Sequence, residues 1–428
     1  MLNILHISTA DNAGGSGRSA YRIHSGLRKL GHRSRMIVGW KVTDDSDVGR
    51  VWPNGFWRIL DRISGEVADR MGLQYLWLPA SHRLPRHPWV KKADVLQLYN
   101  THGGYLSLPV LPRLAAGRPI IWRLSDMWAF TGHCAYSYDC ERWKVGCGSC
   151  PILDEYPPLR RDTTALLWKV KENIYRRCDI TIVAPSRWIA GLVRESPLLG
   201  RFPLHVIPNG LDNEVFRPIP KTVAREVLGL KPDAHVILFT GHSEEAPRKG
   251  AIYFREALGR LLGNLPFEVT LLVMGTSGGG WLDQVGFATR CVGVVTNDLF
   301  MSAIYSAADV FVLPTLADNS PNGVLEAMAC GTPAVAFNVG GVPELVRHME
   351  TGYLAAYKDA TDLARGIHLL LTDGSLRERL GRRCREVVES EHSMELQASR
   401  FVELYQDILQ KRQKEQSKEK VIPQSGQR

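Results

Sequence analysis

The chain has 428 residues, of which 44% are hydrophobic and 23% are charged, so its composition excludes a disordered or fibrous protein. Its length allows two or three domains of ~150 residues. The net charge of +9 would suit nucleic acid, but Lys and Arg are spread along the chain and no nucleic-acid-binding module is recognisable. An anionic small substrate or an anionic membrane surface explains the charge equally well.

The first residues, MLNILHIS, have the character of a buried strand and lack the basic leader and cleavage site of a signal peptide. No apolar run approaches the ~18 residues that a membrane helix needs. We therefore expect a cytoplasmic protein, in contact at most with the cytoplasmic face of the membrane. In that compartment disulfides are disfavoured.

Short β-branched segments alternate with helical patterns along the whole chain, as LNILHIS at 2–8 does with RSAYRIHSGLRKL at 18–30. Several of the strand-like segments are continuously apolar, which is typical of parallel strands covered on both faces. The alternation predicts an α/β fold with doubly wound sheets.

This series runs twice, and the segment 206–220, rich in Pro, Asn and Gly, lies between the two halves. We predict two Rossmann-like domains, 1–208 and 209–390, that face each other across a cleft lined by the carboxyl ends of their strands. A C-terminal helix over 391–412 could cross back to the first domain. The remaining residues, 413–428, are polar and charged and are expected to form a disordered tail.

A glycine-rich motif, NAGGSGRS at 12–19, follows the first strand and opens a helix. Gly14, Gly15 and Gly17 would let the backbone approach a ligand, and the helix N-terminus would offer N–H groups to an anion. A plain tight turn is the alternative. The spacing differs from the dinucleotide-binding fingerprint and no acidic residue follows at the ribose distance, which argues against an NAD-dependent oxidoreductase.

Two cations, Arg248 and Lys249, lie at the mouth of a predicted helix soon after the strand HVILFTG. Two positive side chains beside a positive helix end favour a phosphate group. The alternative is a pair of solvated loop residues.

The segment 309–337 contains a strand that ends at Pro314, a loop with Asp318, and a short helix that we expect to begin with Ser320 as N-cap and Pro321 in the first turn. The N–H groups of the next three residues should be free to bind a ligand. Asp318 and Glu326 could reach the same ligand, and as carboxylates they would accept hydrogen bonds from hydroxyls rather than approach phosphate. The alternative for these two residues is a pair of solvated carboxylates at a helix end. The residues that we expect to supply the free N–H groups are Asn322, Gly323 and Val324.

This segment resembles the signature of the retaining, GT-B-fold glycosyltransferases of family 4: an acidic residue, seven residues, Glu, then A-x-A-x-G-x-P. The chain reads DNSPNGVLEAMACGTP, with Asp318 where the family usually has Glu. The resemblance covers nearly the whole chain, because further motifs of the family occur here in the family's order. They are the N-terminal glycine loop, IPNGLD, RKG, YSAADVFVLP and VGGVPELV.

The resemblance implies roles for individual residues. Glu326 resembles the residue that binds the donor ribose, and Asp318 the one that contacts the transferred sugar. Lys249, with Arg248 nearby, resembles the diphosphate clamp, and Gly15, beside Gly14, the loop glycine under the phosphates. The family needs no divalent metal, so cations and helix ends would stabilise the leaving diphosphate.

Two positions depart from the family pattern. Gly241 is followed by His242 where an arginine is frequent, and Ser125 stands where many relatives have a histidine near the reacting sugar. Asp126 or His133 could cover part of the role of that histidine, so these residues and Ser125 are candidates for the catalytic or acceptor side. Trp128 could stack on an acceptor sugar, or pack in the core as buried aromatics more often do.

Four of the eight cysteines are spaced C-x5-C-x6-C-x2-C within the segment 126–151. A subgroup of the family carries a similar cysteine-rich insert. The compartment and the spacing leave three interpretations: a structural zinc held by four thiolates, reduced packing cysteines, or disulfides. We favour zinc. The four candidate ligands are Cys134, Cys140, Cys147 and Cys150.

The sequence thus predicts a glycosyltransferase that moves a sugar, with retention, from a nucleotide-diphosphate sugar to a glycan or lipid-linked acceptor of a bacterial surface polysaccharide. The alternatives are a GT-B sugar-nucleotide epimerase and a catalytically inactive sugar-binding regulator. No cofactor is expected for catalysis, and no nucleic acid as a partner.

Overall fold

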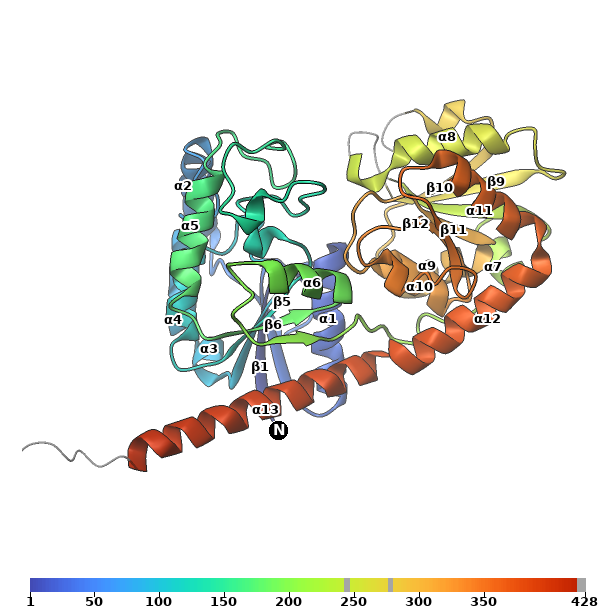
Figure 1. Ribbon diagram of the computed structural model, residues 1–428. Helices are drawn as coiled ribbons and strands as arrows, with labels where there is room; N and C mark the ends of the chain where they lie inside the picture. The colour runs from blue at the N-terminus through green and yellow to red at the C-terminus, as the bar shows by residue number, and fades with distance from the viewer. Residues whose placement is uncertain (242–246, 276–279, 422–428) are drawn as a thin grey trace, which may run out of the picture. The chain divides into compact units, whose positions relative to one another are not determined.

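The computed structural model describes residues 1–241, 247–275 and 280–421. The chain forms two compact units (Figure 1). Unit 1 comprises Met1–Pro185, Ala190–Ile207 and the chain from Glu395 onward, and unit 2 comprises Ser186–Ile189 and Pro208–Met394. The change of unit between Ile207 and Pro208 lies within one residue of the boundary expected from the sequence.

Unit 1 is built on a seven-stranded parallel sheet of order β3-β2-β1-β4-β5-β6-β7. In this doubly wound order the chain reverses its direction of winding between β1 and β4, which is where such sheets bind ligands. β4, β5 and β6 are buried along their whole length, including Gln97 of β4 and Arg123 of β5, as expected for central strands covered on both faces. The strands are β1 (Asn3–Ala10), β2 (Arg33–Trp40), β3 (Val48–Arg50), β4 (Val95–Leu98), β5 (Ile120–Arg123), β6 (Ile180–Ala184) and β7 (Leu204–Val206).

Up to β7, unit 1 contains six α-helices and four 3-10 segments among its described residues. α1 ends before Gly31, whose φ of 81° suits glycine alone among common residues. The α-helices are α1 (Gly14–Lys29), α2 (Gly55–Arg70), α3 (Pro88–Lys92), α4 (Leu111–Ala115), α5 (Thr164–Tyr175) and α6 (Arg187–Glu195), and the 3-10 segments are η1 (Pro79–Arg86), η2 (Leu108–Val110), η3 (Trp128–Phe130) and η4 (Arg142–Lys144).

Unit 2 repeats the design with a six-stranded sheet of order β10-β9-β8-β11-β12-β13, and its winding reverses between β8 and β11. The strands are β8 (His235–Gly241), β9 (Val269–Gly275), β10 (Ala288–Gly293), β11 (Val310–Leu313), β12 (Ala334–Phe337) and β13 (Gly352–Ala355). The helices are α7 (Lys221–Val227), η5 (Pro247–Lys249), α8 (Ala251–Leu261), η6 (Leu282–Gln284), α9 (Asp298–Ala307), α10 (Asn322–Ala329), η7 (Val342–Glu344), α11 (Ala360–Thr372) and α12 (Gly374–Glu391).

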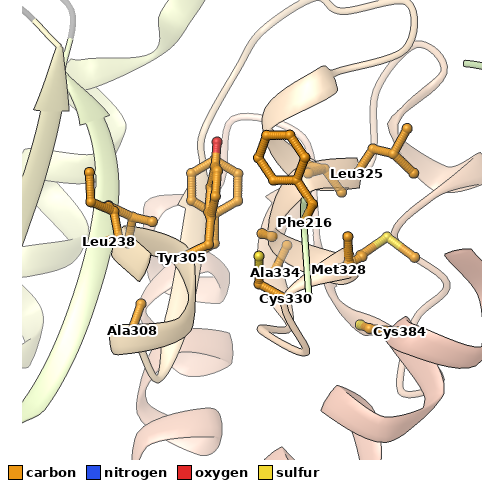
Figure 2. Close-up of a cluster of buried hydrophobic side chains, with 14 of the residues drawn as sticks. Phe216, Leu238, Tyr305, Ala308, Leu325, Met328, Cys330, Ala334 and Cys384 are labelled. Atoms are coloured by element: carbon orange, nitrogen blue, oxygen red, sulfur yellow. The ribbon is translucent and has the colours of Figure 1, made fainter. Parts of the chain in front are cut away.

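One face of the unit 2 sheet is covered by a tightly packed core that includes α9, α10 and α12 (Figure 2). Tyr305 of α9 and Met328 of α10 are fully buried in it. Cys330 and Cys384 belong to the same core, and burial raises the pKa of the Cys330 thiol to about 12. These two cysteines therefore act as small apolar residues.

The last helix, α13 (Met394–Val421), returns to unit 1, where Phe401, Leu404 and Tyr405 join the core formed with β1, β2 and β4. The prediction that the chain is disordered from residue 413 is wrong as far as Val421. The polar stretch is rich in Lys, Glu and Gln, which are good helix formers, so its composition suits a solvated helix as well as a tail. In the described parts of the chain, no helix has both the length and the apolar character needed to cross a bilayer.

Candidate functional site

A loop of unit 2 carries the two predicted phosphate-binding cations at the point where the sheet reverses its winding. Arg248 and Lys249 lie in η5, and Gly250 caps α8 with a φ of 67°. A Cβ at position 250 would lie 1.8 Å from the carbonyl oxygen of Pro314, the residue after β11. Only glycine permits this contact, which joins the loop after β8 to the loop after β11.

The same contact brings three charged side chains together. Arg248 Nη1 lies 3.5 Å and Lys249 Nζ 3.8 Å from Asp318 Oδ2. Arg248 also donates to the carbonyl oxygen of Ala317 at 2.8 Å. Burial lowers the pKa of Lys249, an effect that Asp318 opposes and Arg248 reinforces. The cluster holds two cations and one carboxylate, so it retains a net positive charge that suits an anion.

The backbone beside Asp318 is fixed by a second pair of glycines. Gly341 N–H donates to the carbonyl oxygen of Asp318 at 3.0 Å. A Cβ at Gly340 would lie 2.2 Å from that oxygen, and one at Gly341 1.8 Å from the carbonyl oxygen of Asn319. The VGG segment therefore packs backbone to backbone on the loop that positions the carboxylate.

α10 begins one residue later than the sequence predicted. Pro321 is the N-cap and the helix starts at Asn322, with no side-chain cap. Ser320 as N-cap is thus wrong: its carbonyl oxygen instead accepts from Asn209 Nδ2 at 3.2 Å, and Asn209 also bonds Asn322 Oδ1 at 3.0 Å. This amide bridge ties the start of the helix to the IPNGLD segment.

The N-terminus of α10 offers fewer free donors than expected. Val324 N–H donates to the carbonyl oxygen of Pro321 at 3.2 Å, so the prediction that it is free is wrong. A first turn tightened in this way is common where no side chain caps a helix. Gly323 forms close packing as well, since a Cβ there would lie 3.3 Å from Phe311.

Glu326 lies in the second turn of α10 and is only 2% exposed. Its Oε2 accepts a hydrogen bond of 3.0 Å from the hydroxyl of Tyr305, whose ring belongs to the core in Figure 2. A buried carboxylate held by a buried tyrosine is costly unless it is fully satisfied. The structure therefore places Glu326 rigidly, whereas Asp318 is the more accessible of the two carboxylates.

In unit 1 the glycine motif forms the first turn of α1 where the winding reverses. Gly14 and Gly15 are exposed, and Gly14 has a φ of 61° with open space where its Cβ would be. Gly17 has a different role from the predicted one: a Cβ there would lie 2.9 Å from the carbonyl oxygen of Ala10. It permits close packing of the helix on β1 rather than close approach of a ligand.

Ser125, which stands at the position of the family histidine, follows β5 and bonds the glycine motif. Its hydroxyl donates to Ser16 Oγ at 2.9 Å and accepts from Arg123 Nη1 at 3.2 Å. Arg123 is fully buried, and burial lowers its pKa to about 10. Ser125 thus links the carboxyl end of β5 to the first turn of α1.

His102 is a functional candidate that the sequence reasoning missed. It follows β4, and its Nε2 lies 2.9 Å from Asp126 Oδ2, while Asp126 Oδ1 accepts from Trp128 N–H at 3.0 Å. The other ring nitrogen, Nδ1, is 3.5 Å from the Tyr156 hydroxyl. Its only signal in the sequence is a histidine before two glycines, directly after a strand, in YNTHGG.

Two acceptor-side candidates lie away from open surface. Trp128 is 2% exposed, its ring packs 5.4 Å from that of His102, and Lys171 Nζ lies 3.7 Å from its centre, so it belongs to the core. His133 is 1% exposed and bonds the carbonyl oxygen of Pro157 at 3.0 Å and Cys150 Sγ at 3.4 Å. The structure does not bring it together with Ser125 and Asp126.

The four clustered cysteines are free thiols that line one cavity of about 20 Å³, with His133 beside them. Gly146, Cys147, Gly148 and Ser149 all have positive φ, which is costly at the two non-glycine positions. Among the described residues, however, no three His, Cys, Asp or Glu side chains are grouped as ligands of one ion. The zinc site therefore stays a prediction.

His242, the departure that follows Gly241, lies outside the described residues.

Comparison with known proteins defines the class of this chain. Residues 13–215 match the model described as Glycosyltransferase Family 4, and residues 234–373 match the model described as Glycosyl transferases group 1. The two regions place the chain among the GT-B glycosyltransferases of family 4 and group 1.

Three solved structures share the fold over most of their length. Sucrose-phosphate synthase from Thermosynechococcus elongatus is 20% identical with a TM-score of 0.66, and the match covers 95% of this chain and 99% of that one. WaaG, a glycosyltransferase involved in lipopolysaccharide biosynthesis, is 18% identical with a TM-score of 0.64, and the match covers 92% of this chain and 98% of WaaG. Anabaena HepE in complex with UDP-glucose is 16% identical with a TM-score of 0.65, and the match covers 94% of this chain and 99% of HepE. The prediction of two doubly wound α/β domains of the GT-B kind is confirmed.

Among curated proteins, the D-inositol 3-phosphate glycosyltransferase of Paenarthrobacter aurescens is 32% identical over 190 residues, which is 42% of this chain and 46% of the relative. D-inositol 3-phosphate glycosyltransferase 2 of Catenulispora acidiphila is 32% identical over 213 residues, which is 45% of this chain and 49% of the relative. The matches thus span less than half of these relatives.

The contact of Gly250 with Pro314 predicts a sharp effect of one methyl group. Gly250→Ala should displace Arg248 and Lys249 and weaken binding of a nucleoside diphosphate by at least ~10-fold, because the new Cβ meets a backbone oxygen and the left-handed conformation costs a further ~1–2 kcal/mol. Calorimetric titration with UDP, GDP and ADP measures the effect. The matched control is Gly259→Ala in the same helix, where a Cβ meets nothing within 4 Å; equal binding by both variants would contradict the prediction.

The cysteine cavity generates a metal prediction. Protein purified without chelator should contain about one zinc per chain, as expected for four thiolate ligands. Replacing Cys147 and Cys150 by Ser should release the metal and impair use of the acceptor more than binding of the donor, whereas Cys291→Ser, at an exposed cysteine, should change neither. Metal-free protein with four free thiols and full activity would show that these residues only pack.

Proposed function

We propose that this chain is a retaining, metal-independent glycosyltransferase that moves a hexose from a nucleotide-diphosphate sugar to a glycan or lipid-linked acceptor in bacterial surface polysaccharide synthesis. The observation that carries the proposal is the grouping of Arg248, Lys249 and Asp318 where the unit 2 sheet reverses its winding. Support comes from the family models, from HepE, solved with UDP and with UDP-glucose, and from WaaG, involved in lipopolysaccharide biosynthesis.

In this mechanism the two cations bind the diphosphate. Negative charge grows on the diphosphate as the bond to the sugar breaks, so Arg248 and Lys249 stabilise the leaving group more strongly than the bound donor. Lys249 is held in a partly buried position where its charge is poorly screened. An incoming diphosphate competes with Asp318 for both cations, which leaves that carboxylate to accept hydrogen bonds from the hydroxyls of the transferred sugar.

Glu326 holds the nucleoside part of the donor in this proposal. Tyr305 already occupies one lone pair of its Oε2, and a carboxylate offers about four acceptor positions. Ribose hydroxyls would therefore find a carboxylate whose position is fixed before they arrive, so little conformational entropy is lost on binding.

On unit 1, His102 and Asp126 are the groups suited to the acceptor. Asp126 orients the His102 imidazole through Nε2 and is itself held by Trp128 N–H. A histidine held by a carboxylate in this way keeps a fixed ring orientation, as a group that exchanges a proton with an acceptor hydroxyl needs. The pair thereby compensates for the serine at position 125. Glycosyl transfer would take place in the cytoplasm, and at the inner face of the membrane when the acceptor is lipid-linked.

A thermal-shift panel of UDP-, GDP- and ADP-sugars, followed by assays of transfer with the stabilising donor, tests the proposal. A glycosyltransferase should be stabilised by one nucleotide series and should release its diphosphate faster when acceptor is added. Conversion of the donor to an isomer without acceptor would identify an epimerase. Donor binding with no turnover in any acceptor mixture would identify an inactive regulator, which the serine at position 125 would explain.

Lys249→Ala tests the role of the cation. It should lower turnover by at least ~10-fold, since a hydrogen bond to a charged group contributes ~1.5–3 kcal/mol. It should also weaken binding of the product nucleotide. Steady-state kinetics and product inhibition measure both effects. Lys231→Ala, at an exposed lysine that pairs with Glu268 across 3.7 Å, is the control. A variant altered only in acceptor affinity would assign Lys249 to a different site.

Glu326→Ala and Glu326→Gln together test ribose binding. The alanine variant should weaken donor use by at least ~10-fold, and the isosteric glutamine should retain part of it because its carbonyl oxygen still accepts a hydrogen bond. Donor kinetics with the ribose and 2′-deoxyribose forms of the nucleotide sugar separate the effect from loss of folding. Unchanged discrimination between the two donors in folded variants would reject this role.

A further inference from the structure

A large cavity of unit 1 lies at the free edge of its sheet. Its volume is about 990 Å³, at the upper end of the ~300–1,000 Å³ that is usual for ligand-binding clefts. It runs along β3, the edge strand, and includes residues that follow β2 and β3 as well as the N-terminus of α2. A cavity of this size suits several linked rings rather than a single ion.

Three tryptophans form the aromatic part of the walls. Trp40 ends β2, is 45% exposed and packs edge to face on the buried Trp52, with 5.3 Å between the ring centres. Trp52 Nε1 donates to the buried carboxylate of Asp61 at 2.8 Å, which fixes this pair of rings. Trp89 lies against the edge strand, since a Cβ at Gly49 would be 3.1 Å from its ring. Rings fixed before a ligand arrives lose little conformational entropy on binding it.

The polar part of the walls is basic. No Asp or Glu is among the described residues that line the cavity. Arg50 and Arg86 are exposed, and within the described parts of the chain neither pairs with a carboxylate. The positive end of α2 adds to the same potential. The basic residues of the walls are Lys41, Arg50, Arg58, Arg83 and Arg86.

Carboxylates of the neighbouring elements are already bound to other groups. Asp61 accepts a second hydrogen bond, of 2.8 Å, from Ala80 N–H. Asp47, just before β3, lies 3.3 Å from Arg35 Nε. An anionic ligand in the cavity would therefore meet cations that no lining carboxylate neutralises.

The cavity shares one edge of the sheet with the acceptor-side pair of unit 1. Trp40 and Trp52 lie at the carboxyl ends of β2 and β3, and His102 follows that of β4. Because these strands are parallel, their carboxyl ends lie at the same edge. The strand order puts three spacings of ~4.8 Å, about 14 Å in all, between β3 and β4. A short oligosaccharide can extend over that distance.

We propose that this cavity binds an acidic oligosaccharide, with carboxylates on its sugar rings, at a distance from the reacting sugar. The apolar faces of the sugar rings would pack on Trp40 and Trp89, and the arginines would bind the carboxylates through paired N–H···O bonds. The inference rests on the proposed function, because the oligosaccharide is taken to be a stretch of the glycan that the transfer extends.

The shape and the family favour a glycan over other anionic partners. A bilayer surface is too flat to enter a recess in which Trp52 is only 8% exposed. Single-stranded nucleic acid also combines flat rings with negative charge. The chain, however, belongs to a family of glycosyltransferases, whose substrates are sugars.

Calorimetric titration and tryptophan fluorescence of the full chain, without donor, test the proposal. The probes are hexagalacturonate, the neutral maltohexaose of the same length, and hexathymidylate. The variants are Trp40→Ala, which removes a ring face, and Arg50→Ala with Arg86→Ala, which removes two cations. The controls are Trp77→Ala, at a 55% exposed tryptophan outside the cavity, and Arg379→Ala with Arg382→Ala, at two exposed arginines of α12.

We expect hexagalacturonate to bind more weakly as salt rises, and maltohexaose to bind at least ~10-fold more weakly than hexagalacturonate. Affinity for hexagalacturonate should fall at least ~5-fold in Trp40→Ala and at least ~10-fold in the Arg50 and Arg86 variant, and should not change in the controls. Unfolding midpoints confirm that the variants fold.

Three results would overturn the inference: equal binding of the acidic and neutral oligosaccharides, wild-type affinity in either cavity variant, or tighter binding of hexathymidylate, which would assign the cavity to nucleic acid. Assays of transfer separate this inference from the proposed function. A chain that transfers sugar but does not bind hexagalacturonate overturns the inference alone. A chain that binds hexagalacturonate through the cavity but turns over no donor overturns glycosyl transfer alone.

Discussion

The close approach of backbones at three glycines is the constraint on which the ion cluster of unit 2 depends. Gly250 packs on Pro314, Gly340 on Asp318 and Gly341 on Asn319, at distances where a Cβ could not exist. Because these contacts are made by backbone, they fix the loop positions without using the charged side chains. The ion cluster of Arg248, Lys249 and Asp318 is therefore carried by loops whose positions are set by backbone packing.

The excess positive charge of the chain is spread along the sequence but partly concentrated in space. One concentration is the pair of cations beside Asp318, where a carboxylate moderates it. The other is the tryptophan-lined cavity of unit 1, which lacks acids.

Local patterns allowed much of this to be predicted. The alternation of apolar runs with helical periods gave the doubly wound sheets, and the order of the motifs gave the family. Two errors arose at contacts between segments distant in sequence: Gly17 packs on Ala10, and Ser320 bonds Asn209 rather than capping α10. A third was local, since Val324 N–H bonds the carbonyl oxygen of Pro321 within the first turn. The 24-residue separation of His102 and Asp126 hid that pair, and the polar composition after residue 412 did not distinguish a solvated helix from a tail.

The return of α13 to unit 1 has a consequence for biosynthesis. The core between β1, β2 and β4 contains Phe401, Leu404 and Tyr405, which follow unit 2 in the chain and are translated after it. The N-terminal sheet can begin to form early, but that face stays open to water while the ribosome makes nearly two hundred residues of unit 2. The core of unit 1 is therefore completed only after unit 2 has been synthesised. A prematurely terminated chain would expose the apolar surface of that core to chaperones and proteases.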